Sequence, residues 1–228
     1  MKDLDNQVVL VTGASRGIGL HVAKAAAREG AQLILMARTV AALEALADDI
    51  EANGGRAPLL QPIDFRGATW EDYLSIAGSL ESHFQAIDAC IFNAAALGEP
   101  GPLAGYALEA WASVMQVNVN APFLLLNALL PLLRRSKHAR VIFSLISTCA
   151  ATRAFAGAYG VSKAALRAMV AILSDEFESD PGLSVFGIDP GPVDTALYRL
   201  AYPGADFELL AKPQDAASAF IAALGGNN

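Results

Sequence analysis

The sequence holds very little of the chemistry that binds metals or forms disulfide networks. Its 228 residues include only two cysteines and three histidines. Cys90 lies in an apolar run and Cys149 stands alone, so neither belongs to a C-x-x-C pair or a cysteine–histidine cluster. No metal site is therefore expected.

Positive charge is also scarce. Sixteen lysines and arginines stand against 23 acidic residues, which gives a formal net charge of −7. Proteins that bind nucleic acid or an anionic membrane surface present a broad basic face. Neither partner is expected here, whereas an anionic cofactor needs only a local positive spot and is compatible with this balance.

Long hydrophobic runs are missing as well. The longest, residues 121–133, is interrupted by Pro122, Asn127 and Pro131, and a membrane-spanning helix needs about 20 apolar residues. The first residues show no basic stretch followed by an apolar stretch and a cleavage site, so no signal peptide is expected. These features predict a cytoplasmic location.

What the sequence does contain is a regular alternation of short apolar runs and longer helical patterns. The apolar runs are continuous, as in a parallel sheet that is covered on both faces. They span residues 7–12, 32–36, 57–63, 88–92, 140–146 and 183–188. Helical patterns span residues 17–29, 40–53, 69–84, 108–133, 158–178 and 213–224. We therefore predict one α/β domain over residues 1–228, a three-layer, doubly wound Rossmann fold with a mainly parallel sheet of six strands.

One stretch, residues 190–212, departs from this alternation. It is rich in proline and glycine and carries the aromatics Tyr198, Tyr202 and Phe207. It follows the carboxyl end of a predicted strand, which is where open α/β sheets bind ligands. We predict that it covers a substrate; the alternative is an ordinary long surface loop.

A glycine-rich loop joins the first predicted strand to the first helix, Thr12-Gly-Ala-Ser-Arg-Gly-Ile-Gly19. Gly13 permits a tight turn, Gly17 lets the backbone approach a pyrophosphate, and Gly19 lets the helix pack closely on the strand. The amino terminus of the helix then offers free N–H groups to the anion. A strand before the loop and a helix after it are the context that this dinucleotide-binding motif requires.

The end of the second predicted strand indicates which dinucleotide is bound. An acidic residue there would accept hydrogen bonds from the adenosine ribose and repel a 2′-phosphate. This chain has Arg38 instead, and a guanidinium suits a phosphate. Arg16 can add a second positive charge, so NADP(H) is predicted over NAD(H). Asp64 and the Phe65 amide, after the third strand, are expected at the adenine edge. The alternative for Arg38 is an ordinary surface arginine.

Tyr159 and Lys163 lie four residues apart on a predicted helix, so they share one face. A nearby ammonium favours the phenolate and is expected to lower the pKa of the tyrosine from its free value near 10. Such a tyrosine can exchange a proton with an alcohol or alkoxide near neutral pH. The spacing alone is common on helix surfaces and gains weight from its place after the fifth strand.

Taken together, these segments resemble the motifs of the short-chain dehydrogenase/reductase family, in the family's order and over nearly the whole chain. The matches are Thr12-Gly-x-x-x-Gly-Ile-Gly19, Phe92-Asn-Ala-Ala95, Val117-Asn118, Tyr159-x-x-x-Lys163 and Asp189-Pro-Gly-Pro-Val-Asp-Thr195. The resemblance implies an oxidoreductase that transfers hydride between a nicotinamide and a carbonyl or secondary alcohol of a small molecule.

The resemblance also implies roles for single residues. Tyr159 would be the general acid/base, Lys163 its pKa-lowering partner, and Asn118 the holder of a water that relays protons through Lys163. Val193 and Thr195 would hold the nicotinamide carboxamide. The complete set expected at the cofactor is Gly13, Ser15, Arg16, Gly17, Ile18, Gly19, Arg38, Asp64, Phe65, Asn93, Ala94, Ala95, Tyr159, Lys163, Pro190, Gly191, Val193 and Thr195.

The family's catalytic serine, thirteen residues before the tyrosine, has no clear counterpart. Counting back from Tyr159 reaches Ile146, and Ser144 and Ser147 stand on either side of it. If the loop is one residue shorter, Ser147 is the donor to the substrate oxygen, and we assign it that role. The alternatives are Ile146 at the site, Thr148 as the donor, or a Ser147 that only satisfies local backbone groups.

Two further departures bear on function. Ala95 replaces a glycine of the family's Asn-Asn-Ala-Gly segment, and no counterpart of the family's usual seventh strand is expected near the end of the chain. A homodimer through residues 120–133 and 158–178 is therefore expected rather than a tetramer. The missing serine also keeps open a second class of function, a dinucleotide-binding sensor or interaction protein with little catalysis.

Overall fold

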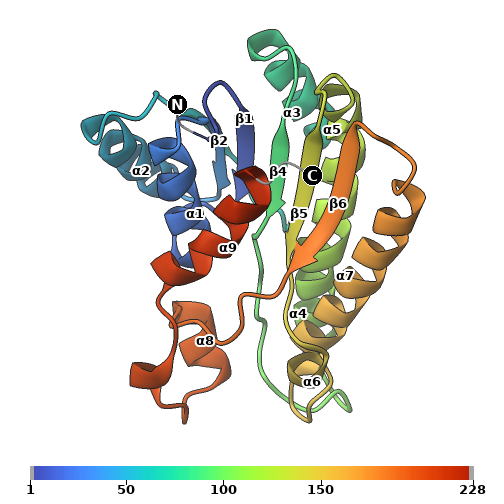
Figure 1. Cartoon of the computed structure of the whole chain (residues 1–228). Coiled ribbons are helices and arrows are strands. Elements are labelled where there is room, and N and C mark those ends of the chain that lie inside the picture. Colours follow the sequence, from blue (N-terminus) through green and yellow to red (C-terminus); the bar gives the residue numbers. More distant parts are fainter. Residues whose placement is uncertain (1–2, 226–228) are drawn as a thin grey trace.

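In a computed structural model of the chain, residues 3–225 are described and form a six-stranded parallel sheet with helices on both faces (Figure 1). The strand order is β3-β2-β1-β4-β5-β6. The strands are β1 (Val8–Thr12), β2 (Gln32–Ala37), β3 (Leu59–Pro62), β4 (Ala89–Phe92), β5 (Ala139–Ser144) and β6 (Leu183–Ile188). The predicted doubly wound Rossmann architecture is confirmed.

Six longer helices or helical runs cover the sheet where the sequence predicts them. They are α1 (Gly17–Arg28), α2 (Val40–Ala52), α3 (Trp70–His83), the run of α4 (Leu108–Met115) and α5 (Ala121–Leu133), α7 (Gly157–Glu176) and α9 (Pro213–Gly225). Three short elements were not predicted. These are α6 (Thr148–Ala151), α8 (Ala196–Ala201) and a 3₁₀ turn, Phe207–Leu209.

The sheet is buried on both faces, which explains why its strands are continuously apolar. In β1, Leu10 packs into the core beneath α3, α5 and α7, whereas Val9 and Val11 pack into the core beneath α1, α2 and α9. All three side chains are completely buried. Adjacent residues thus contribute to opposite cores, as the pleat of a strand requires.

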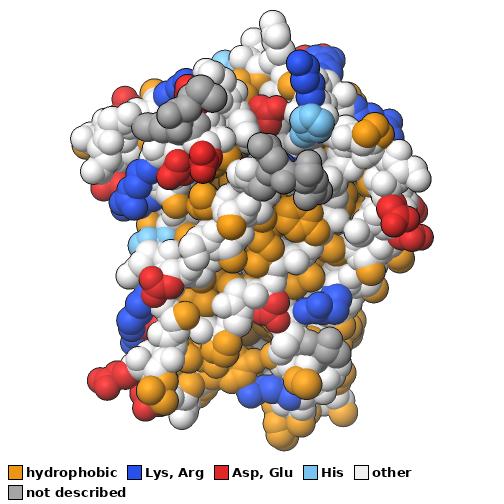
Figure 2. All heavy atoms as spheres, viewed as in Figure 1, with side chains coloured by type: hydrophobic (Ala, Val, Ile, Leu, Met, Phe, Trp, Pro, Cys, Tyr) orange, Lys and Arg blue, Asp and Glu red, His pale blue; other side chains and the backbone are white. Residues whose placement is uncertain are grey.

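One edge of the sheet stays open in the described part of the chain. β6 pairs only with β5, and no seventh strand follows it within residues 3–225. Figure 2 shows hydrophobic side chains beside this edge of the sheet, over β6 and between α9 and α7. Phe186 and Ile188 of β6 are half-buried there.

The helical run Leu108–Leu133 is, by length and composition, apolar enough to cross a membrane, but half of its most apolar stretch is buried inside the protein. Leu125, Leu129 and Leu132 belong to the core beneath the sheet. The run therefore has the character of a core helix. A π-helical turn, Gln116–Asn120, interrupts it, and π turns of this kind often mark functional positions.

Candidate active site

A cleft of about 560 Å³ lies at the carboxyl ends of the strands. The sheet order changes direction here, because β1 lies between β2 and β4, and such a switch point is the usual ligand site of open α/β sheets. Figure 1 shows α6 and α8 beyond these strand ends, at the bottom of the view. The cleft therefore lies between the sheet and the segment that we predicted to cover a substrate.

Most of the predicted cofactor residues line this one cleft. They are Gly13, Ser15, Arg16, Gly17, Ile18, Arg38, Asp64, Phe65, Asn93, Ala94, Ala95, Tyr159, Lys163, Pro190, Gly191, Val193 and Thr195. Three predicted residues are not in its lining: Gly19, Asn118 and Ser147. Further lining residues, outside the set predicted at the cofactor, include Arg66, Leu97, Ser144, Leu145, Ile146, Leu197, Tyr198 and Leu200.

The glycine loop has the geometry that its sequence predicts. Gly13 has a φ of +68°, and a Cβ added there would lie 2.8 Å from the Cα of Ala94. Gly19 lies behind the loop, where a Cβ would be 2.4 Å from the carbonyl oxygen of Gly13. Its role is therefore to let α1 approach β1, and it is not a lining residue.

Thr12 joins the glycine loop to the segment after β4, a contact that the sequence analysis did not assign. Its Oγ1 accepts hydrogen bonds from the amides of Asn93, at 3.0 Å, and Ala94, at 3.1 Å. The same hydroxyl donates to the carbonyl of Ile91 at 3.3 Å. One buried side chain thus sets the spacing between the two backbone segments that face the cleft.

The far end of the cleft carries three arginines, Arg16, Arg38 and Arg66. No carboxylate forms a salt bridge with any of them within residues 3–225. Arg66 follows Asp64 in a turn that is closed by a hydrogen bond from its amide to Asp64 Oδ1, at 3.1 Å. Three guanidinium groups without an internal counter-ion make this end suited to a phosphate.

At the other end of the cleft, Tyr159 and Lys163 project from α7. Lys163 is 4% exposed, and its Nζ donates to the carbonyl oxygen of Ser144 at 2.8 Å. Burial lowers the pKa of this ammonium to about 8, although Asp189 acts in the opposite direction. Nζ lies 5.9 Å from the centroid of the Tyr159 ring. The pair therefore meets in the cleft as its spacing predicts.

The pKa of Tyr159 differs from the expectation in its direction. Burial raises the pKa of the phenol above its ordinary value, and the neighbouring Tyr202 and Asp189 raise it further. The loss of hydration on burial disfavours the phenolate more strongly than the Lys163 ammonium stabilises it. Lys163 is itself buried, and its Nζ already donates a hydrogen bond to the carbonyl of Ser144. The phenol is consequently protonated at neutral pH, and the expectation of a lowered pKa is wrong for this structure.

Asn118 lies behind the cleft and holds the backbone together. Its Oδ1 accepts from the Ala96 amide at 2.8 Å, and its Nδ2 donates to the Ala96 carbonyl and to Ser162 Oγ, both at 2.9 Å. Ser162 Oγ in turn donates to the carbonyl of Tyr159 at 2.8 Å. These bonds link the segment after β4 to the helix that carries Tyr159. They also occupy both amide hydrogens of Asn118.

Ile146, and not Ser147, faces the site. Ile146 lines the cleft, and the guanidinium of Arg167 donates to its main-chain carbonyl. Ser147 is exposed, and its hydroxyl accepts from the Ala150 amide at 3.2 Å. Ser147 therefore begins α6 as a helix cap and lies outside the lining of the cleft, and its assignment as the substrate donor stays a prediction. The side chain of Thr148 lies outside the described part of the structure.

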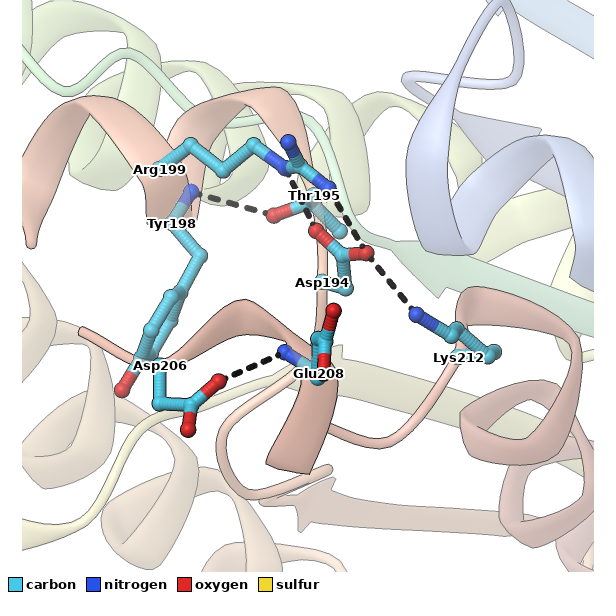
Figure 3. A network of polar contacts seen from close by, with 7 residues as sticks. All are labelled: Asp194, Thr195, Tyr198, Arg199, Asp206, Glu208 and Lys212. Atoms are coloured by element: carbon cyan, nitrogen blue, oxygen red, sulfur yellow. Dashed lines mark hydrogen bonds and ion pairs between the residues drawn. The ribbon is translucent and has the colours of Figure 1, made fainter. Parts of the chain in front are cut away.

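Residues 190–212 form an ordered segment closed on itself (Figure 3). The Asp194 carboxylate accepts from Arg199 at 2.6 and 3.0 Å and from Lys212 at 3.1 Å. These bonds lower the pKa of Asp194 to about 2. The Asp194 amide also donates to the Ala211 carbonyl at 2.9 Å, so the two ends of the segment are held side by side.

Comparison with known proteins identifies the family. The short chain dehydrogenase model matches residues 7–203. The chain belongs to the short chain dehydrogenase family. A relative from Escherichia coli K12, the uncharacterized oxidoreductase YciK, is 36% identical over 225 residues, covering 99% of this chain and 88% of the relative. The chain is therefore related to oxidoreductases.

Two solved structures of the family are especially similar. A short chain dehydrogenase from Escherichia coli CFT073, complexed with NADPH, has a TM-score of 0.94 at 36% identity and covers 99% of this chain and 93% of its own. One from Shigella flexneri 2a, complexed with NADP, has a TM-score of 0.93 at 36% identity and covers 100% and 94%.

Within this family the site has two further departures that the structure accommodates. Phe92, in place of the first asparagine of the Asn-Asn-Ala-Gly segment, is buried and stacks on Phe143 with 4.7 Å between ring centroids. Ala95, in place of the glycine, lines the cleft. The first substitution extends the core, and only the second adds an atom on the cofactor side.

Proposed function

We propose that this protein is an NADP(H)-dependent oxidoreductase that transfers hydride between the nicotinamide and a carbonyl or secondary alcohol of a small, uncharged molecule. The observation that carries the proposal is that one cleft joins the glycine loop and the arginine-rich end to the Tyr159–Lys163 pair. Cofactor binding and proton transfer need these two ends in a single site.

The residues present fit NADP(H). The positive φ values of Gly13 and Gly17 open the loop in front of the amino terminus of α1, where backbone N–H groups favour an anion. Arg38, with Arg16, would hold the 2′-phosphate, and Asp64 the adenine edge. The complexes of two similar structures with NADPH and NADP support this choice over NAD(H). When bound, the cofactor supplies the hydride.

The residues around the reacting end would handle the proton. Because burial raises the pKa of Tyr159, its phenol is protonated at neutral pH and suited to donate to a carbonyl oxygen as that oxygen gains charge. Lys163, protonated below about pH 8, would restore the proton. The protonated phenol is the form that reduction of a carbonyl requires.

Asn118 contributes to this route through its main chain. Pro122 lies four residues after it and has no N–H, so the Asn118 carbonyl lacks its ordinary α-helical donor. A carbonyl released in this way, next to a π turn, is a suitable acceptor for a water between Asn118 and Lys163. Both amide hydrogens of the side chain are already used, which makes the main chain the better anchor.

The lining of the substrate end favours an uncharged substrate. The side chains there are mainly apolar: Ala96, Leu97, Leu145, Ile146, Leu197 and Leu200. Pockets of this kind orient a ligand through few polar groups, here Tyr159 and Tyr198. We propose that residues 190–212 cover the bound substrate, because α8 supplies part of this lining.

The test is oxidation of NADPH in the presence of benzaldehyde, cyclohexanone and diacetyl. We expect turnover with at least one of them by the wild-type protein and no measurable turnover by Tyr159→Phe, which lacks the donated proton. Calorimetric titration should give the same NADPH affinity for both proteins, because the variant keeps the ring. Equal activity of the two proteins would refute the role of Tyr159.

A second candidate function is a dinucleotide-binding sensor or interaction protein with little catalysis. It is favoured by Ile146, which lines the cleft and stands thirteen residues before Tyr159, where the family has its serine. NADPH binding without turnover of any of the three carbonyls would support this candidate against the first.

We also propose a cytoplasmic homodimer formed through α5 and α7. Phe123 of α5 and Ile172 of α7 are 48% and 58% exposed, and apolar side chains of this size on neighbouring helices favour a contact with a second copy.

A further inference from the structure

The cleft leaves little room for a substrate beside a bound cofactor. Its volume is about 560 Å³, which lies within the range of about 300–1,000 Å³ that sites for a single drug-sized ligand have. NADP(H) consists of two joined nucleotides and a further phosphate, and it would take up most of this volume. A reacting carbonyl fits beside Tyr159, whereas the rest of any substrate larger than a few atoms continues toward the mouth of the cleft.

The apolar lining of the cleft continues to the surface along one face of α8. Leu197 and Leu200 are three residues apart on this helix, so they share a face, and both line the cleft. Leu197 is half-buried, whereas Leu200 is 70% exposed. The face therefore leads from the inside of the cleft to its mouth.

The connection between β5 and α7 brings a second apolar side chain to this mouth. The guanidinium carbon of Arg153 lies 4.1 Å from the centroid of the Tyr202 ring, so the connection contacts the carboxyl end of α8. Two residues after Arg153, the side chain of Phe155 is 66% exposed. The connection starts near Ile146 and leads to Tyr159, and both of these residues line the cleft.

The loop after β4 lies against the same connection. It lines the cleft at Gly98, and farther along the Gly101 amide donates to the Phe155 carbonyl at 3.0 Å. Leu103, two residues later, is 55% exposed. We call Leu103, Phe155 and Leu200 the apolar rim. Figure 2 shows hydrophobic side chains at the lower end of the view, where Figure 1 places α6 and α8.

The backbone of Phe155 favours a role in contact with a ligand. Its φ is +66°, in the left-handed region that a bulky residue seldom adopts. Strained conformations of this kind concentrate at ligand-binding positions. The ring gains little burial in return from the described part of the chain, and an apolar ligand that lies on it would supply that burial.

We propose, on the basis of the function proposed above, that the substrate is a carbonyl compound with an apolar chain, which extends from Tyr159 past Leu200 onto the apolar rim. Single exposed hydrophobic side chains are common on protein surfaces. These three differ because they lie on adjoining segments at the mouth of one cleft. They offer a polar chain no hydrogen bonds in exchange for its hydration, so an alkyl chain fits them best.

The test is a series of ligands of increasing chain length. Values of kcat/KM for butanal, hexanal and octanal with NADPH measure the reaction. Calorimetric titration of the NADP⁺-loaded protein with butanamide and octanamide, which a nicotinamide does not reduce, measures binding alone. Each methylene group that becomes buried should raise kcat/KM and affinity about 2-fold to 4-fold. The wild type should therefore prefer the eight-carbon compound to the four-carbon compound by about 10-fold or more in both assays.

Three variants test whether the chain lies on the rim. Leu200→Ser and Leu103→Ser remove apolar side chains, and Phe155→Asn does so with a residue that tolerates a positive φ. Each should lower the preference for the longer chain about 3-fold to 10-fold. The matched control is Leu74→Ser, which removes a leucine that is 48% exposed on α3 and should leave the preference as in the wild type.

The proposal is overturned if octanamide binds to the wild type no more tightly than butanamide, if the rim variants keep the preference, or if Leu74→Ser lowers it equally. Size-exclusion chromatography tests the other occupant of such a surface, a second copy of the chain. A smaller assembly in the rim variants, with no chain-length preference in the wild type, would assign the rim to that copy and overturn the proposal.

The two assays also separate this proposal from the proposed function. Turnover of the aldehydes without a preference for chain length overturns this proposal alone. If the wild type reduces none of the aldehydes but binds octanamide more tightly than butanamide, the proposed function fails, and the rim remains a site for an apolar chain.

Discussion

The two ends of the cleft are built in different ways. The cofactor end is assembled from residues that follow strands within two positions: Gly13 after β1, Arg38 after β2, Asp64 after β3 and Asn93 after β4. The substrate end is assembled from loops and short helices, with Ile146 before α6 and Tyr198 on α8. The first end inherits its geometry from the sheet, whereas the second depends on how irregular segments pack.

This difference explains where the site keeps the family's motifs and where it departs from them. A Cβ at Gly13 would clash with the backbone of Ala94, in the segment that follows the neighbouring strand β4, so only glycine fits there. At the substrate end, Ile146 lines the cleft and the adjacent Ser147 does not, so the loop presents an alkyl residue to the cleft in place of a hydroxyl residue. Residues at the ends of strands can be replaced by few others, whereas loop residues can be replaced by residues with different functional groups.

The largest effect is expected at Lys163, at the substrate end of the cleft. Its pKa falls from 10.5 to about 8 on folding, which corresponds to a destabilisation of about 3 kcal/mol at neutral pH. Because the unfolded chain binds the proton more tightly, this cost is present below pH 8 and disappears between pH 8 and 10.5. Lys163→Met should therefore be more stable than the wild type at pH 7, with an advantage that fades toward pH 10.5.

Chemical denaturation of both proteins across this pH range measures the effect. Titrations of other groups cancel in the difference between the two proteins. A difference that does not change with pH would show that Lys163 is hydrated and that burial does not lower its pKa.

The next effect concerns the cofactor end. Arg38→Ala should weaken NADPH binding about 10-fold to 100-fold, because a hydrogen bond to a charged group contributes about 1.5–3 kcal/mol. NADH binding should change little, since NADH lacks the 2′-phosphate. Fluorescence titration with each cofactor provides the comparison. An equal loss for both cofactors would remove Arg38 from the 2′-phosphate site.

The smallest effect is expected in segment 190–212. Asp194→Asn removes the charge that pairs with Arg199 and Lys212, and the segment should then be cut faster by trypsin after Arg199. Exposed ion pairs are screened by salt, so high salt should bring the wild type closer to the variant. The pKa of Asp194 is about 2, so its pairing is present above its unfolded pKa and is lost only as the pH falls toward 2.

Asp206→Asn is the matched control for this experiment. Asp206 lies in the same segment and accepts a hydrogen bond from the Glu208 amide at 3.1 Å, but it forms no ion pair within the described residues. Cleavage that is equally fast in both variants would show that the Asp194 network does not hold the segment.

Much of the fold could be predicted because it depends on local patterns. The continuous apolar runs predicted all six strands, since a parallel strand with both faces buried leaves no other composition. Errors of boundary occurred where a run continued past the sheet, as at Ile146, two residues after β5 ends at Ser144. α6 and α8 were missed because four and six residues are too few for a helical period to be seen.

By itself, the sequence determined the cofactor end of this protein. Its glycines and Arg38 are set by backbone conformation and by their position after strands, and both can be deduced from neighbouring residues. Only the tertiary structure decided the substrate end: that Ile146 faces the cleft, that the pKa of Tyr159 is raised, and that Tyr202 lies under Arg153. These properties depend on burial and on contacts between residues far apart in the chain, and no local pattern encodes them.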